Sequence, residues 1–206
     1  MCTLFFPVKQ VIKVNRSWII MASSIFFIAA LVFYFSNLTS TAAFDEETAG
    51  GQLEPLNDLF SMILETPPVI SAMLVFMNNF FSMALMLLLG FLAGILPLIT
   101  LGLNGSLVGT ILAHNTQDGI PLLPSIVFGL LPHGIFELFA FFLCGAIGLK
   151  FGYHCIAAPL PDKTRMQSFR HIWKEAISIL PLVLFLLITA AFIEVMITPH
   201  LLETTL

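Results

Sequence analysis

Charged residues are scarce in this chain. Asp, Glu, Lys and Arg together make up 10% of its 206 residues, whereas soluble domains carry about 25%. Apolar residues make up 58%, and the mean hydropathy is +1.00. A water-soluble fold of this length has no way to bury so much apolar surface. The composition therefore excludes a soluble globular protein and predicts an all-α, polytopic transmembrane helical bundle.

Other features are also missing or rare. Outside the apolar segments there is too little chain for a soluble domain, a low-complexity tail or a basic patch that binds nucleic acid, so we expect no nucleic-acid partner. Only three cysteines occur. Cys2 and Cys155 are expected in the reducing cytoplasm and Cys144 lies in a predicted helix, so we expect no disulfide.

The uncharged runs set the number of spans. Residues 66–117 contain no Asp, Glu, Lys or Arg, and one span needs about 20 apolar residues, so this run must hold two helices. We predict a single transmembrane domain over residues 1–206, with an extracytoplasmic loop at 39–66 and five spans at 18–38, 67–90, 93–114, 121–152 and 174–198. The first apolar run is longer than a signal-peptide core, so we expect it to be retained. The fourth span exceeds one crossing, and residues 119–131 are expected either to cross or to re-enter.

The positive charges predict the orientation. All eight basic residues fall in two regions of the chain: Lys9, Lys13 and Arg16 in the first, and Lys150, Lys163, Arg165, Arg170 and Lys174 in the second. Loop 39–66 contains acidic residues but no Lys or Arg. The positive-inside rule then places the N-terminus and loop 152–171 in the cytoplasm, and five spans place the C-terminus outside the cell membrane.

Small residues recur at four-residue spacing, a pattern that lets membrane helices approach closely. The pairs are Gly90/Gly94, Gly105/Gly109 and Gly148/Gly152. We interpret them as helix-packing faces, either within one chain or between chains. A homodimer formed through these faces is expected.

Polar and helix-breaking residues gather in three of the predicted spans: Asn78, Asn79, Asn104, Pro132, His133, Gly134 and Glu137. At about 1.5 Å per helical residue, Asn78, Asn104 and Glu137 all fall near the middle of the bilayer. A carboxylate at that depth costs roughly 2.5–3.5 kcal/mol on insertion scales, so we expect it to be paired. The Asn104–Gly105 pair and the Pro132–Gly134 segment predict broken or kinked helices.

His133 and Glu137 lie one helical turn apart and allow three interpretations. They tie broken helices together, they line a transport cavity, or they bind a metal or act in catalysis. A zinc-protease H-E-x-x-H motif is absent, and the surroundings of Ser106 do not resemble a nucleophile elbow. We therefore expect no enzyme activity, no cofactor and no metal site. Glu175 and Glu194 are expected at the inner and outer interfaces, without a function.

Three segments resemble one family of membrane proteins. They are "FMNNF" (Phe76–Phe80), "LNGSLVG" (Leu103–Gly109) and "LLPHGIFELFAFFLCGAIGLKFG" (Leu130–Gly152), and together with their order they are similar to the stage II sporulation protein M family. The resemblance covers roughly Val69 to Gly152. It implies an integral membrane protein without its own catalytic domain. The namesake of the family works in a complex with cell-wall-remodelling proteins, so the resemblance implies envelope proteins as partners.

Two functions follow as hypotheses. The first is a non-enzymatic scaffold or assembly partner in a membrane complex. Its expected partners are the lipid bilayer, a second copy of the chain and other membrane or envelope proteins. The alternative is a channel or transporter with a polar mid-membrane cavity lined by Asn78, Asn104, His133 and Glu137.

Overall fold

The computed structural model describes residues 6–39 and 67–205 of the chain, and within these ranges every regular element is a helix. The elements are α1 (Val8–Val14), α2 (Arg16–Thr39), α4 (Pro68–Leu88), α5 (Ile95–Gln117), α6 (Leu122–Pro124), the π-helix η1 (Ser125–Leu130), α7 (Leu131–Ile156), α8 (Arg165–Met196) and α9 (Thr198–Thr205). Five helices are long and apolar enough to cross a membrane, with α6, η1 and α7 counted as one. This number confirms the predicted all-α polytopic bundle. Most of the predicted 39–66 loop lies outside the described residues.

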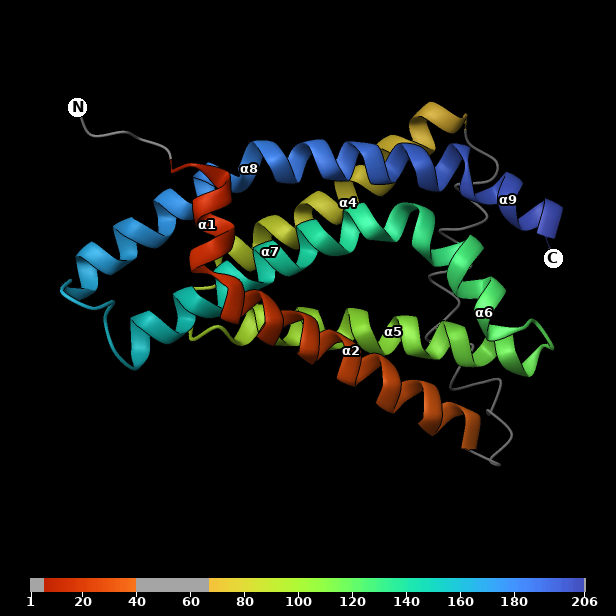
Figure 1. Ribbon diagram of the computed structural model, residues 1–206, viewed down its shortest axis with the longest axis horizontal. Coiled ribbons are helices and arrows are strands. Elements are labelled where there is room, and N and C mark those ends of the chain that lie inside the picture. The colour runs from red at the N-terminus through yellow and green to blue at the C-terminus, as the bar shows by residue number, and fades with distance from the viewer. Residues whose placement is uncertain (1–5, 40–66, 206) are drawn as a thin grey trace.

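The helices form two groups that meet at one end of the molecule (Figure 1). Helices α4, α7 and α8 pack together, and α2 packs mainly on α5. The groups diverge toward the opposite end, where α6 and η1 run between them (Figure 1). Helix α7 is central, since it contacts α2, α4, α5 and α8. Its residues 140–152 are all buried. They form the second half of Leu130–Gly152, the longest segment that resembles the family, and their burial accounts for its many apolar residues.

The fourth span is bent but continuous. Pro124 ends α6, Pro132 stands near the start of α7, and the six-residue π-helix η1 lies between them. Proline cannot donate a backbone hydrogen bond, and a π-type turn shifts the bonding partner by one residue so that the chain stays helical. Residues 122–131 are therefore part of one continuous helical stretch of 35 residues, from Leu122 to Ile156, and whether they cross the bilayer or re-enter it stays a prediction.

Helix α5 is not broken, contrary to the prediction from its Asn-Gly pair. It runs without interruption from Ile95 to Gln117. The Asn104 side chain donates to the Thr100 carbonyl at 2.8 Å, so its amide is used within the helix. Opening a helix inside a bilayer leaves backbone groups unsatisfied, and this cost exceeds the local turn preference of Asn-Gly.

The glycine faces pack within the chain. Gly105 and Gly109 lie directly against the backbone of Phe26 and Ala30 in α2. A Cβ atom added at Gly90 would lie 2.7 Å from the Gly148 Cα, and Gly152 lies against Gly94 in the turn before α5. These contacts occupy all three glycine pairs, so the expected homodimer cannot use them without separating helices of the same chain.

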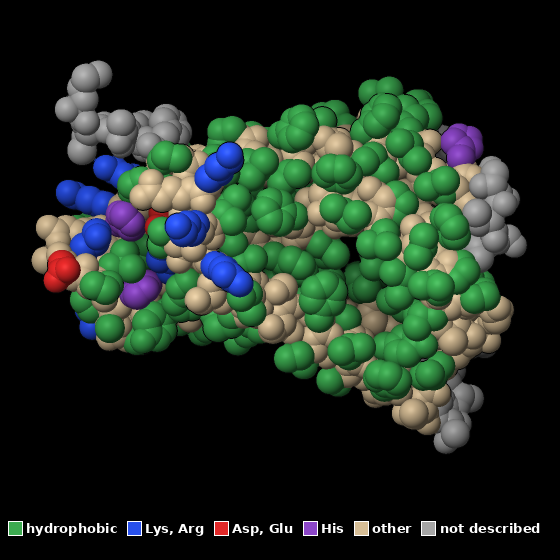
Figure 2. All heavy atoms as spheres, in the orientation of Figure 1, with side chains coloured by type: hydrophobic (Ala, Val, Ile, Leu, Met, Phe, Trp, Pro, Cys, Tyr) green, Lys and Arg blue, Asp and Glu red, His purple; other side chains and the backbone are tan. Residues whose placement is uncertain are grey.

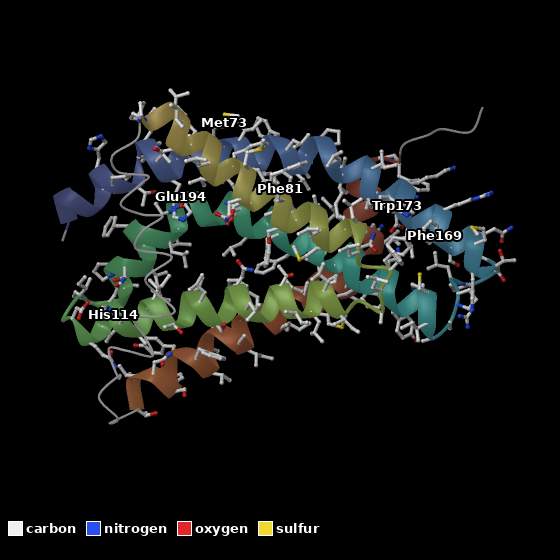
Figure 3. The ribbon with its side chains drawn as sticks, turned by 180° about the vertical axis from the view of Figure 1, so that it is seen from behind. Met73, Phe81, His114, Phe169, Trp173 and Glu194 are labelled. Carbon is white, nitrogen blue, oxygen red and sulfur yellow. The ribbon has the colours of Figure 1, made fainter. Side chains whose placement is uncertain are left out.

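Basic side chains gather at one end of the molecule (Figure 2). Hydrophobic side chains cover most of the remaining visible face, as expected for a surface in contact with lipid (Figure 2). Rings of Trp18 and Tyr153 lie 5.6 Å apart, and those of Phe151 and Trp173 lie 5.8 Å apart. Trp173 lies toward the basic end (Figure 3). Aromatic rings next to basic residues are typical of a membrane–water interface.

Candidate functional site

The first candidate site joins α7 to α8. His133 and Glu137 project from consecutive turns of α7, and Glu194 projects from the last turn of α8. One ligand atom from each lies within 4.8 Å of the others. Figure 3 shows Glu194 at the part of α8 that faces the start of α7. All three residues are half-buried, and neighbouring protein atoms desolvate both carboxyl groups.

Thr198, the first residue of α9, orients the His133 ring. The Thr198 hydroxyl lies 3.3 Å from His133 Nδ1 and 3.3 Å from the Ile193 carbonyl. A hydroxyl has one proton. The carbonyl can only accept that proton, so we assign the Nδ1–H of His133 as the donor to Thr198. The lone pair of the neutral ring then lies on Nε2.

The two glutamates lack conventional partners. Neither carboxyl group forms a hydrogen bond or an ion pair with another residue in the described part of the chain, and the charge of Glu137 acts on Glu194. Like charges this close repel. A proton or a cation must therefore compensate the charge of the pair.

The asparagines predicted to join this cluster form their hydrogen bonds outside it. Asn78 is exposed and its side-chain amide lies 3.4 Å from the Asn79 Oδ1, while Asn104 bonds within α5. Depth along a helix places residues at one level but does not say which way each side chain points. Of the four residues predicted to line the cavity, His133 and Glu137 belong to the group of ligand atoms that includes Glu194. Sequence reasoning assigned no role to Glu194, although its four-residue spacing to Thr198 mirrors that of His133 to Glu137.

A second polar centre lies nearer the basic end. Lys150 of α7 and Glu175 of α8 form an ion pair of 2.6 Å, and each residue is 3% exposed. Asn15, between α1 and α2, donates to the same carboxylate oxygen at 3.2 Å. His171 Nε2 lies 3.4 Å from the other oxygen. Three parts of the chain, namely α7, α8 and the α1–α2 junction, thus meet at one carboxylate.

This centre also fixes the N-terminal segment. Asn15 is fully buried, donates to the Val11 carbonyl at 2.9 Å, and leaves its Oδ1 without a hydrogen-bond partner among the described residues. The Phe6 amide donates to the Ser178 hydroxyl at 2.8 Å. A small cavity of about 50 Å³ lies beside Glu175 and is lined by Phe6, Gln10, Val11, Val14, His171 and Glu175. We predicted Glu175 at the inner interface without a function, because charge spacing alone did not reveal its partner across the helix pair.

An apolar layer separates the two centres. Glu137 and Lys150 are 13 positions apart on α7, or about 20 Å along the axis. Residues 140–149 between them are buried and carry no charged side chain. No hydrogen bond of the described chain connects the two centres across this layer.

The fold and the two polar centres define a polytopic helical membrane protein with one buried ion pair and, at a second level, a half-buried group of titratable side chains. Residues 18–199 match the model of the stage II sporulation protein M family, so the chain belongs to this family. It is also similar to an uncharacterized protein of Methanocaldococcus jannaschii, with 32% identity over 124 residues that cover 60% of this chain and 68% of that protein. No solved structure matches the chain.

Proposed function

We propose that this protein is a non-enzymatic assembly partner in a membrane complex, linked to remodelling of the cell envelope. The observation that carries the proposal is the buried ion pair of Lys150 and Glu175, together with Asn15. It ties α1, α7 and α8 into one unit at the end of the molecule where the basic side chains gather (Figure 2). A surface whose supporting helices are fixed in this way is suited to binding a partner.

The apolar layer along α7 supports this function over conduction. A channel or transporter needs polar groups or water along its path, whereas residues 140–149 form a buried apolar segment between the two polar centres. Transport remains the second candidate, because the unpaired carboxyl groups of Glu137 and Glu194 resemble the intramembrane acids of transporters. The transport cavity that we expected also required Asn78 and Asn104, and the described side chains of these residues bond elsewhere.

The proposed orientation follows from the charges. The N-terminus and the turn between α7 and α8 lie in the cytoplasm, and the C-terminus lies outside the cell membrane. The gathering of Lys and Arg at one end supports this orientation (Figure 2). In this orientation the end of the molecule that carries the basic side chains faces the cytoplasm, where it can bind partners.

The proposal also includes a homodimer. Its interface is helix α4, because the three glycine pairs already pack within the chain. Asn78 stands in the middle of α4 and is exposed, and its amide lies next to Asn79. Met73 and Phe81 flank it on the same helix and are 60% and 59% exposed (Figure 3). A polar side chain exposed at mid-span is stabilised by hydrogen bonds to a neighbouring helix. A second copy of α4 provides such a partner.

Native gel electrophoresis of solubilised membranes, combined with liposome reconstitution, tests this function. We expect the wild-type protein to migrate in a complex larger than a dimer, and we expect Lys150→Met to release it from the complex. Reconstituted wild-type protein should carry no proton or cation flux. Flux that disappears in both Glu137→Gln and Glu194→Gln, with Asp118→Asn unaffected, would instead establish transport.

A further inference from the structure

We infer that His133, Glu137 and Glu194 form a binding site for a divalent transition-metal ion, with Zn²⁺ as the best-matched ion. The ligand atoms come from two helices, since α7 supplies an imidazole and a carboxylate and α8 supplies a second carboxylate, and all lie within 4.8 Å of one another. This site goes beyond the proposed assembly function and does not depend on it. It also revises the expectation that the chain binds no metal.

The donor set selects the class of ion. Imidazole nitrogen favours zinc and neighbouring transition metals over Mg²⁺ and Ca²⁺, which prefer oxygen ligands alone. Zn²⁺ is bound by histidine and glutamate at about 2.0–2.2 Å, and tetrahedral ligands at that length lie roughly 3.4 Å apart. The ligand atoms lie up to 4.8 Å apart, so changes of side-chain rotamer need to bring them closer by about 1.4 Å at most to reach that spacing. Three protein ligands leave a fourth position for water.

The surroundings of the Glu137 and Glu194 carboxyl groups favour a site that holds a cation. Both carboxyl groups are desolvated and make no hydrogen bond or ion pair with other described residues. Two carboxylates carry two negative charges, and one divalent ion neutralises both.

Thr198 prepares the histidine for this role. It accepts the Nδ1–H of His133 and donates to the Ile193 carbonyl, which leaves the Nε2 lone pair available to a metal. Metal-binding histidines usually donate their other ring N–H to an oxygen, and removing that oxygen typically weakens metal binding 10- to 100-fold. A bound ion would thereby fasten the bend before α7 to the junction of α8 and α9.

Metal titration of the full-length protein in nanodiscs tests the site. After chelator treatment we expect about one equivalent of Zn²⁺ to bind per chain, and Co²⁺ to give the visible absorption bands of a tetrahedral site. Glu194→Gln and His133→Ala should each weaken Zn²⁺ binding at least about tenfold, and Thr198→Val should do so by about tenfold. The matched control is His114→Ala, because His114 forms another histidine–carboxylate pair at four-residue spacing, 2.8 Å from Asp118.

The outcomes separate the metal site from its competitors. Absence of Co²⁺ bands and of Zn²⁺ uptake in wild-type protein overturns the inference, and this measurement needs no variant to fold. Equal weakening by His114→Ala also overturns it, since binding would then be non-specific. An infrared band of a shared carboxyl proton that persists in excess Zn²⁺ would assign the pair to a proton instead.

Discussion

Lys150 Nζ lies 2.6 Å from Glu175 Oε2 in a place where both side chains are almost completely removed from solvent. Desolvating two charges is costly, and their attraction repays that cost only when both partners are present. Removing either residue therefore leaves the charge of the other buried without its partner. It also makes the packing of α7 on α8 sensitive to the loss of either charge.

We predict that Lys150→Met destabilises the fold by about 3–5 kcal/mol, because it leaves the Glu175 carboxylate buried without its cation. The double variant Lys150→Met with Glu175→Leu should recover much of this loss, since no uncompensated charge remains. Unfolding in mixed micelles, followed by the fluorescence of Trp18 and Trp173, measures both changes.

The exposed pair of His114 and Asp118 provides the control for that experiment. Its side chains are 54% and 56% exposed, and exposed pairs contribute at most about 1 kcal/mol. His114→Ala should therefore have a small effect. If the double variant at Lys150 and Glu175 is no more stable than the single one, the pair does not act as described.

We predict that Gly109→Ala loosens the packing of α5 on α2. A Cβ atom at this position would overlap the backbone of Ala30, and overpacking of this kind costs about 1–3 kcal/mol. Gly102, on the same helix, has no atom within 4 Å of such a Cβ. Gly102→Ala is thus a matched control that should leave stability unchanged or raise it by up to about 1 kcal/mol. Thermal unfolding of the two variants compares them directly, and equal melting temperatures would contradict the packing assigned to Gly109.

Sequence reasoning predicted the five helices because a long uncharged run is stable in a bilayer as a membrane-spanning helix. It also identified His133 and Glu137, since four-residue spacing places both on one helix face. It did not identify Glu194 or the partner of Lys150, because these relationships depend on how α7 and α8 pack and on the rotation of each helix. Asn104 is a second example of a residue whose depth is predictable from sequence while its hydrogen-bond partner is not. Its level in the bilayer was predictable, but the Thr100 carbonyl within α5 is its partner.

We predict that cysteine labelling places the two ends of the bundle on opposite sides of the membrane. In a variant without native cysteines, Asp118→Cys at the end of α5 should react with an impermeant maleimide in intact cells. Asp162→Cys, in the turn between α7 and α8, should react only after permeabilisation, because the proposed orientation places that turn, with its basic residues, in the cytoplasm. The reverse labelling pattern would invert the proposed topology, and the basic surface would then face outward.

We predict that Asn78→Leu weakens self-association without lowering the stability of the monomer. Asn78 is exposed at the middle of α4, so leucine suits the lipid at least as well, while hydrogen bonds between membrane helices contribute about 0.6–2 kcal/mol. Loss of such bonds raises the dimer dissociation constant by roughly 3- to 30-fold, measured by energy transfer between labelled chains in liposomes. Ser106→Ala is the control, because the Ser106 hydroxyl bonds to the Leu103 carbonyl within α5 and should not affect association. An unchanged dissociation constant in Asn78→Leu would exclude α4 as the interface. Because the glycine faces already pack within the chain, any dimer would then have to form through another helix.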